Sequence, residues 1–453
     1  MSHYLRSVQS WLKVNANDSA TIVWDKQNPI SLAFLRREVA TLHRRLIEQP
    51  VTRVALYFED HYSFVIALLA CLYAKKIPVL LGHSKLSRIL LEHSHYDLLL
   101  IAHPLDTTVN YEVFQPGITP EFTDDRLPDL DLQQTIELFT SGSSGHPKKV
   151  IKTLQQMDDE STLIAPLFQG RMADCYLLTS VPPCHLYGLT FTLWLPLALG
   201  IPVNRKKISF PEEFSAVHPH QSYVFVTSPA FLKRIDETLP SPPTSLVISA
   251  GGDLDHATVM QVTSWLGLGI DEIYGSTETG AMAHRYRQGT EQPWRCLPGL
   301  HFTSSEKGWL LRSPLIKEET GLALSDELSF VDNHYFHLIG RLSRLIKLEE
   351  KRISLDDIER QLLTLDGIID AAVITVPMQR RQRIAALVVM TPALQQQWRL
   401  NRASMECHWR QALGAYLEDI AMPRYWRAVT SIPRDSLHKR QDSRLKELFF
   451  ETR

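Results

Sequence analysis

The chain has 453 residues, of which 44% are hydrophobic and 22% are charged, and its formal net charge at pH 7 is −2. These values are ordinary for folded globular proteins, and they exclude a disordered or fibrous chain. Because 48 basic residues nearly balance 50 acidic ones and no long run of one sign occurs, we do not expect a nucleic-acid partner. The length exceeds that of a usual single domain, so we expect one large unit and at least one smaller one.

The cysteines and the apolar segments indicate the cellular compartment in which we expect the protein. The five cysteines are scattered and form no C-x-x-C pair, which argues against a disulfide framework or a zinc site and indicates a reducing compartment. The first residues lack the apolar core and cleavage site of a signal peptide. The longest apolar stretches, 64–74 and 189–203, are shorter than the roughly 20 residues of a membrane-spanning helix. We therefore expect a cytoplasmic protein without a membrane span.

The first two thirds of the chain alternate helical and strand patterns, as in an α/β layered fold. Apolar residues at helical spacing predict helices over 31–46 and 64–75, and short apolar runs predict strands over 54–58, 77–81 and 97–102. Residues 107–131, rich in Pro, Thr and Asp, are expected to form a loop. A second series predicts strands over 176–180, 223–227, 245–249 and 271–274.

The last third of the chain has a different pattern. Short alternating strands over 308–312, 327–331 and 335–339 predict a small β-subdomain. A further unit then follows, with helices over 355–363 and 403–416 and strands over 370–376 and 383–389. We therefore expect the α/β fold class, with a large N-terminal domain over 1–341 and a small α+β C-terminal domain over 342–453.

Residues 138–152 combine a strand, a loop of glycines and small hydroxylated residues, and a second, basic strand. Such a loop suits phosphate, because its backbone N–H groups can converge on an anion while hydroxyls and a lysine reach charged oxygens. The candidate residues are Thr140, Ser141, Gly142, Ser143, Ser144, Gly145 and Lys148. The G-x-x-x-x-G-K-[ST] pattern is absent. On composition alone, a plain Gly/Ser surface turn is equally open.

The order of these residues resembles a known signature. Thr-Ser-Gly-Ser-Ser-Gly-His-Pro-Lys-Lys-Val, over 140–150, is similar to the loop of the adenylate-forming superfamily, which includes acyl-CoA synthetases, aryl-CoA ligases, peptide synthetase adenylation domains and firefly luciferase. A second match is Tyr-Gly-Ser-Thr-Glu-Thr-Gly over 274–280, and the resemblance extends over nearly the whole chain. The resemblance implies that Tyr274 and Gly275 lie near adenine, that Thr277 contacts the α-phosphate and that Glu278 binds Mg²⁺. A carboxylate suits that role, because Mg²⁺ prefers oxygen ligands.

Other segments match the family in the expected order. The resemblance places Ala250, Gly251 and Gly252 against adenine and the substrate carboxylate, and it places His185 at the border of the acyl pocket.

Two further matches concern the ribose and phosphate groups of ATP. The resemblance implies that Asp326 binds the ribose hydroxyls and that Arg341 meets ribose or phosphate. It also implies that Lys439 enters the active site for adenylation, carried by a mobile C-terminal domain that swings about a hinge after Arg341.

The resemblance implies an AMP-forming acid–thiol ligase, similar to small bacterial acyl- or aryl-acid ligases. With ATP and Mg²⁺, a carboxylic acid would form an acyl-adenylate and pyrophosphate, and the acyl group would pass to the thiol of CoA or of a carrier-protein phosphopantetheine. Two departures, His438 and Glu350, stand where relatives have glycine. Glu350 makes an acyl carrier protein a serious alternative to CoA. The sequence also leaves open a non-catalytic nucleotide-binding relative and a luciferase-type reaction.

The acid itself is only bounded by the sequence. His185 stands where amino-acid adenylation domains have an aspartate for the substrate amine, which favours a plain carboxylic acid. An aryl acid such as a hydroxybenzoate or cinnamate, and a short to medium acyl chain, both fit the mixture of aromatic and small residues. The candidate pocket residues are His185, Tyr187, Gly188, Thr227, Ser228, Ala250, Gly251, Ala281 and Met282.

Overall fold

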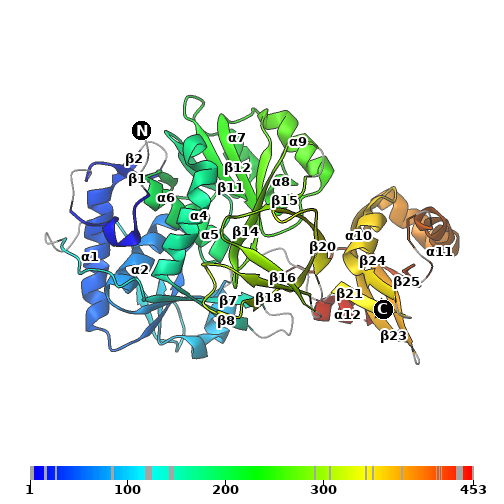
Figure 1. Ribbon diagram of the computed structural model, residues 1–453, viewed down its shortest axis with the longest axis horizontal. Coiled ribbons are helices and arrows are strands. Elements are labelled where there is room, and N and C mark those ends of the chain that lie inside the picture. The colour runs from blue at the N-terminus through cyan, green and yellow to red at the C-terminus, as the bar shows by residue number, and fades with distance from the viewer. Residues whose placement is uncertain are drawn as a thin grey trace. The chain divides into compact units, whose positions relative to one another are not determined.

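The structure is a computed structural model (Figure 1). It describes residues 5–14, 18–25, 28–82, 86–117, 125–141, 147–289, 292–305, 308–341, 344–348, 351–378, 381–414, 416–417, 419, 421–434 and 442–450. The chain divides into two compact units, one made of 1–142, 146–301 and 312–320 and the other of 143–145, 302–311 and 321–453. The α/β fold class is confirmed, and the boundary predicted after Arg341 stays a prediction.

The first sheet of the first unit is parallel except at one edge. Its strand order is β6 (Tyr111–Val113), β5 (Leu98–Ile101), β3 (Arg53–Tyr57), β4 (Ile77–Leu80), β7 (Thr135–Ser141) and β8 (Pro147–Thr153), and only β7 and β8 pair in antiparallel fashion. Helices α1 (Leu32–Glu48) and α2 (His61–Tyr73) lie side by side (Figure 1) and share one core with this sheet. Because α2 is buried on all sides, its sequence is almost continuously apolar. The loop predicted over 107–131 was wrong at β6, a short edge strand.

A second, longer sheet in this unit carries most of the predicted site. Its order is β15 (Trp294–Cys296), β14 (Gly280–Arg287), β13 (Ile270–Ser276), β12 (Thr244–Ala250), β11 (Tyr223–Thr227), β9 (Tyr176–Thr179), β10 (Val203–Asn204), β1 (Thr21–Asp25) and β2 (Asn28–Ser31). The strands from β13 to β1 run parallel, and β13 and β14 form an antiparallel hairpin. The parallel strands are apolar on both faces, as expected where helices cover the sheet on both sides.

Besides α1 and α2, the first unit contains α4 and several shorter helical segments. α4 (Leu154–Met172) begins with a capping box between Thr153 and Gln156 and packs against β8, β12 and β14. The remaining helical segments are η1 (Val8–Ser10), α3 (Leu86–Leu91), η2 (His93–His95), α5 (Leu186–Leu189), the π-helical η3 (Thr190–Trp194), α6 (Leu195–Leu199), α7 (Pro211–Ser215), α8 (Pro229–Leu232) and α9 (His256–Leu266).

Among the described residues, the second unit is built from strands, which pair in antiparallel fashion except for β24 with β25, and three helices. Its strands are β16 (His301–Ser305), β17 (Gly308–Arg312), β18 (Leu322–Ala323), β19 (Asp326–Phe330), β20 (Tyr335–Arg341), β21 (Leu345–Leu348), β22 (Lys351–Ser354), β23 (Ile368–Met378), β24 (Arg381–Met390) and β25 (Tyr425–Ala428). Its helices are α10 (Leu355–Leu363), α11 (Pro392–Leu413) and α12 (Asp442–Phe450). In the part of the chain that is described, no helix has the length and apolarity needed to cross a bilayer.

Candidate active site

The candidate phosphate loop joins β7 to β8. In the register of these strands Thr140 pairs with Lys148, and Thr140 Oγ1 lies 3.4 Å from the carbonyl oxygen of Lys148. Side chains alternate along a strand, so Lys148 and Lys152 share one face of β8. Gly142, Ser143, Ser144 and Gly145 and the side chain of Ser141 lie outside the described residues, and their roles stay predictions.

A tight turn joins β13 to β14 and carries Thr277 and Glu278. The N–H of Ser276 donates to Thr279 Oγ1 at 3.0 Å, and the N–H of Thr279 donates to Ser276 Oγ at 3.2 Å. At Gly275 an added Cβ would lie 2.3 Å from the carbonyl oxygen of Gly280, so the strands can approach this closely only because Gly275 has no side chain. The turn therefore has a fixed backbone.

The structure brings the two signature segments together. Lys148 Nζ lies 3.0 Å from Glu278 Oε1, across 130 residues of sequence. Lys152 Nζ donates to the carbonyl oxygen of Glu278 at 3.0 Å. A basic strand and an acidic turn, each predicted to contact ATP, thus meet at one place.

The environment of Glu278 keeps its carboxylate ionised. Burial raises the pKa of Glu278, but the hydrogen bond and charge of Lys148, together with bonds from its own backbone and from Ser276, outweigh this effect, and the pKa lies below its usual value. No group of three His, Cys, Asp or Glu side chains is placed to hold a metal by itself, within the described ranges. A single ionised carboxylate fits a Mg²⁺ ion that brings phosphate oxygens and waters as its other ligands.

Ala250 and Tyr274 lie at the carboxyl ends of neighbouring parallel strands. Ala250 ends β12 opposite Ile273 of β13, and in open α/β sheets ligands bind outside these ends. The ring of half-buried Tyr274 has its centroid 5.6 Å from that of Trp294. Gly251 and Gly252 follow β12 and are exposed, with φ +88° at Gly251. Their backbone is exposed, and the contact with adenine and the carboxylate that the resemblance implies stays a prediction.

The candidate acid pocket is bordered by α5 and by the ends of β11 and β12. His185 is the N-cap residue of α5, and an added Cβ on Gly82 would lie 3.0 Å from its Cε1. Tyr187 Oη lies 3.0 Å from the carbonyl oxygen of Thr227 and 2.9 Å from that of Ile248. Burial raises the pKa of Tyr187 well above its ordinary value, so this hydroxyl acts as a neutral donor. The tyrosine ring is fixed across the strand ends.

The other candidate pocket residues lie around Tyr187. Ala250, Ala281 and Tyr187 belong to one apolar cluster, and Met282 is 1% exposed. Ser228 is the N-cap residue of α8, directly after Thr227. The role of these residues in binding the acid stays a prediction.

Asp326, Arg341 and Lys439 belong to the second unit. Asp326 begins β19, and its register partner in β20 is Arg341. The side chain of Arg341 and the whole of Lys439, His438 and Glu350 lie outside the described residues. The roles given to Asp326, Arg341 and Lys439 stay predictions.

Two buried charged residues near Glu278 were missed by the sequence reasoning. Lys152 is 3% exposed and Glu160, on α4, is 4% exposed. Glu160 Oε1 accepts from the N–H of Ala281 at 2.8 Å, and Glu160 Oε2 accepts from Thr190 Oγ1 at 3.1 Å. The only available sequence signal was the alternation along β8, which places Lys152 on the same face as Lys148.

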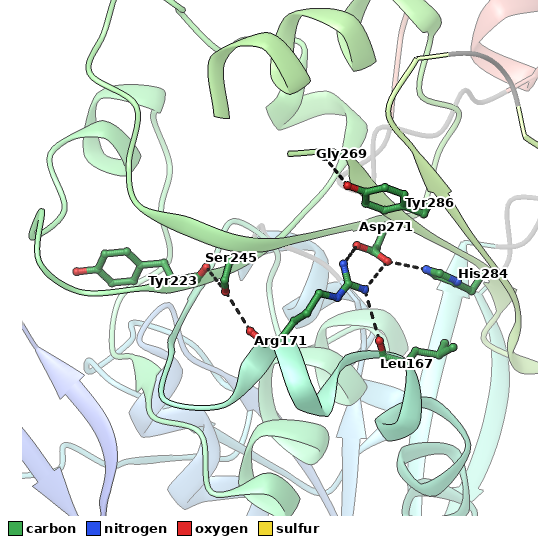
Figure 2. A network of polar contacts seen from close by, with 8 residues as sticks. All are labelled: Leu167, Arg171, Tyr223, Ser245, Gly269, Asp271, His284 and Tyr286. Atoms are coloured by element: carbon green, nitrogen blue, oxygen red, sulfur yellow. Dashed lines mark hydrogen bonds and ion pairs between the residues drawn. The ribbon is translucent and has the colours of Figure 1, made fainter. Parts of the chain in front are cut away.

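The other end of the β13–β14 hairpin is held by a second buried carboxylate (Figure 2). Asp271, with a fully buried side chain, accepts from Arg171 of α4 at 2.7 and 2.8 Å and contacts His284 Nε2 at 2.7 Å. Next to this network, the N–H of Gly269 donates to Tyr286 Oη at 3.0 Å. α4 is therefore bonded to the turn end of the hairpin through Glu160 and to the opposite end of the hairpin through Arg171.

A cavity of about 390 Å³ lies away from these residues. It is lined by Arg53, Ser94, His95, Tyr96, Asp97, Glu137, Phe139 and Lys149. Its buried carboxylate, Glu137, is already paired with Arg53 and Lys149 at 3.3 Å. None of the predicted site residues lines this cavity, so its volume does not describe the candidate active site.

Comparison with known proteins finds enzymes that are similar to this chain. The family described as AMP-binding enzyme matches residues 124–303. A 4-coumarate–CoA ligase of Cereibacter sphaeroides is 25% identical over 308 residues, which cover 67% of this chain and 69% of the ligase.

Solved structures share the fold. ATP-bound MatB from Rhodopseudomonas palustris superposes with a TM-score of 0.80 at 18% identity, covering 97% of each chain. A benzoate CoA ligase from Burkholderia xenovorans LB400 superposes with a TM-score of 0.77 at 19% identity, covering 95% of this chain and 97% of the ligase. The chain is therefore similar to the AMP-binding enzymes over residues 124–303, and over nearly its whole length it has the fold of these adenylate-forming ligases.

Proposed function

We propose that this protein is an AMP-forming acid–thiol ligase. It activates a carboxylic acid with ATP, releases pyrophosphate and transfers the acyl group to a thiol. The observation that carries the proposal is the 3.0 Å contact between Lys148 and Glu278. It joins the candidate phosphate loop, residues 140–148, to the turn over 276–281 that carries Glu278, which we call the metal-binding turn. A site that neutralises polyphosphate charge needs both elements in one place.

In the first half-reaction, one oxygen of the substrate carboxylate attacks the α-phosphorus of ATP, and the bond from that phosphorus to the pyrophosphate oxygen breaks. No general base is required, because a carboxylic acid is already ionised at neutral pH. Glu278 would hold Mg²⁺, whose charge, when it is bound, offsets that of the phosphates. Lys148 and, as we propose, Lys439 would supply positive charge to the same oxygens, and the resemblance implies that N–H groups of the 140–145 loop would orient them.

In the second half-reaction, the thiol sulfur attacks the acyl carbon of the adenylate and AMP leaves, while the thiol proton passes to solvent. The relatives named as CoA ligases support CoA as acceptor. A carrier-protein phosphopantetheine is the second candidate acceptor, because Glu350 replaces the glycine expected beside the thiol channel.

For the acid we propose a compact substrate, either an aryl acid or a short acyl chain. Tyr187 is bonded across the ends of β11 and β12 and packs on Phe191, with ring centroids 5.2 Å apart. A tyrosine fixed in this way limits the depth available to an extended chain. Matched relatives named for 4-coumarate and for sulfoacetate are consistent with compact acids.

We also propose a cytoplasmic, reducing location. All five cysteines lie within the described part of the chain, and none of them forms a disulfide. Burial raises the pKa of the Cys184 thiol to about 12, so this cysteine, next to His185, is expected to be a neutral pocket neighbour rather than a nucleophile.

The test is acid-dependent exchange of labelled pyrophosphate into ATP, over a panel of hydroxybenzoates, cinnamates and short acids. We expect exchange that requires Mg²⁺ and at least one compact acid. Lys439→Ala should lower the forward adenylation rate at least about 100-fold, whereas Lys233→Met, which removes an exposed ion pair with Asp255, should not change it.

Acceptor identity follows from the same assay extended to thioester formation, with CoA first and a phosphopantetheinylated carrier protein second. Tight ATP binding without exchange for any acid would instead support a non-catalytic nucleotide-binding protein. Light emission with a luciferin-type acid would point to an oxygen-using, luciferase-type reaction.

A further inference from the structure

Lys152 is hydrogen-bonded to the backbone of the metal-binding turn. It lies on β8, is 3% exposed and donates from Nζ to the carbonyl oxygen of Glu278 at 3.0 Å. This bond is made to the backbone of Glu278, whereas Lys148 contacts its carboxylate. Lys148 is 62% exposed at its side chain, so a ligand can displace it, but the buried Lys152 has no comparable access to solvent.

Glu160 holds the other side of the same turn. It projects from α4, four residues after Gln156, which donates to the carbonyl oxygen of Leu315 at 2.9 Å. Its two carboxylate oxygens accept from the N–H of Ala281 at 2.8 Å and from Thr190 Oγ1 at 3.1 Å. Its side chain also fills the space beside Gly280, where an added Cβ at φ +72° would lie 3.1 Å from Glu160 Oε1.

The two buried groups compensate each other electrostatically. Burial lowers the pKa of Lys152, and the charges of Glu160, Glu278 and Glu318 oppose this shift. Burial raises the pKa of Glu160, and Lys152 and the two hydrogen bonds oppose it. Buried ion pairs contribute little net stability compared with apolar side chains of similar volume. The more direct effect of these two groups is the geometry that their hydrogen bonds impose on the turn.

We propose that Lys152 and Glu160 are positioning residues for adenylation. They fix the turn at the carbonyl of Glu278 and at the N–H of Ala281, and thereby aim the Glu278 carboxylate at Mg²⁺. This inference rests on the proposed function, in which Glu278 is the metal ligand. Groups that orient a metal ligand through hydrogen bonds typically change metal affinity when they are removed.

The test compares three variants with the wild-type protein. Lys152→Met and Glu160→Met keep similar volume and remove the bonds to the turn, while Glu160→Gln keeps a carbonyl oxygen that can accept from Ala281. The matched control is Lys233→Met, which removes the exposed ion pair with Asp255 at 3.0 Å. Each protein is first checked for folding by circular dichroism and urea unfolding.

Two readouts separate positioning from general stability. The first is the Mg²⁺ concentration for half-maximal pyrophosphate exchange, and the second is Mn²⁺ binding in the presence of a non-hydrolysable ATP analogue, followed by electron paramagnetic resonance. Both methionine variants should weaken metal affinity about tenfold or more, with less than about threefold change for Glu160→Gln. The KM for the acid should stay unchanged in all variants. The control Lys233→Met should keep the metal affinity of the wild-type protein.

Hydrogen exchange supplies a third readout on the ligand-free protein. Amides of residues 276–281 should exchange faster in both methionine variants, while those of β11 and β12 should not. Folded methionine variants with wild-type Mg²⁺ and Mn²⁺ affinity would overturn the inference. Should Lys152→Met not fold, the pair Glu160→Met and Glu160→Gln gives the same decision. If the wild-type protein binds Mn²⁺ with the analogue but catalyses no exchange, the proposed function fails, and metal affinity still decides the inference.

Discussion

The close backbone approach at the β13–β14 turn, which we propose to bind Mg²⁺, can be tested by adding one methyl group. In Gly275→Ala the new Cβ would lie 2.3 Å from the carbonyl oxygen of Gly280 and 3.0 Å from Cα of Ala281. The first distance is roughly 1 Å short of van der Waals contact. Both neighbouring atoms are backbone atoms, so no side-chain rotation can relieve the clash and the strands themselves must separate.

The expected cost follows from what opposes that separation. Overpacking of a well-packed site typically costs about 1–3 kcal/mol. Here β14 is held in place by the bond from Ala281 to Glu160 and by pairing with β13, so we expect the upper end, about 3 kcal/mol of unfolding free energy. A displacement of about 1 Å at a reacting geometry can lower activity on the order of 100-fold. Gly275→Ala should therefore lose both stability and adenylation activity.

The matched control is Gly170→Ala in α4, where nothing lies within 4 Å of an added Cβ. That substitution should stabilise the protein by about 0.5–1 kcal/mol, because alanine favours a helix more than glycine does. Urea unfolding monitored by tryptophan fluorescence measures the stability, and pyrophosphate exchange measures the activity. The reasoning is refuted if Gly275→Ala unfolds at the same urea concentration as the wild-type protein and keeps its exchange rate.

Three further predictions concern the surroundings of this turn. Arg171→Met removes the arginine partner of the buried Asp271 and leaves its contact with His284; it should lower the unfolding free energy by about 2–3 kcal/mol, somewhat less than for a fully buried pair because Arg171 is partly exposed, and urea unfolding measures this. Gly188→Ala would place a Cβ 2.0 Å from the carbonyl oxygen of Pro182, so α5 must shift and the KM for the acid should rise at least about tenfold, while binding of the ATP analogue stays unchanged in calorimetry. The lowered pKa of Glu278 means that its ion pair with Lys148 stabilises the fold above the ordinary glutamate pKa of 4.5 and that this contribution disappears as the pH falls further; the stabilities of wild type and Lys148→Met should therefore converge in acid.

Local sequence patterns predicted the elements whose environment is uniform. The parallel strands β9, β11, β12 and β13 are short apolar runs, and they form close to the predicted ranges because both faces of each strand are buried. The helix predicted over 403–416 is instead α11, which begins at Pro392 and has a non-helical residue, Asn401, within it. The Thr391 cap and the proline in the first turn were a usable signal for that start.

The candidate site was predictable only in part. The two signature segments could be recognised from residue order, and the contact of Lys148 with Glu278 joins them across 130 residues. The burial of Lys152 and Glu160 could not be predicted, because each of them is bonded to the β13–β14 hairpin, which lies more than 100 residues away in the sequence. A charged residue in a strand or helix is exposed by default, and its partner becomes known only when the chain is folded.

The contacts of Glu278 divide into a permanent set and a replaceable one. The carbonyl oxygen of Glu278 accepts from the buried Lys152. Three residues later, the N–H of Ala281 donates to the buried Glu160. The carboxylate of Glu278 instead meets Lys148, whose side chain is 62% exposed, and an ion pair with so exposed a partner contributes little free energy. Under the proposed function, Glu278 could therefore exchange Lys148 for Mg²⁺ at small cost, and the freed ammonium of Lys148 would be available to the phosphate oxygens. A metal ligand needs both properties, because a rigid backbone sets its direction and a weakly held carboxylate leaves its oxygens available to the metal.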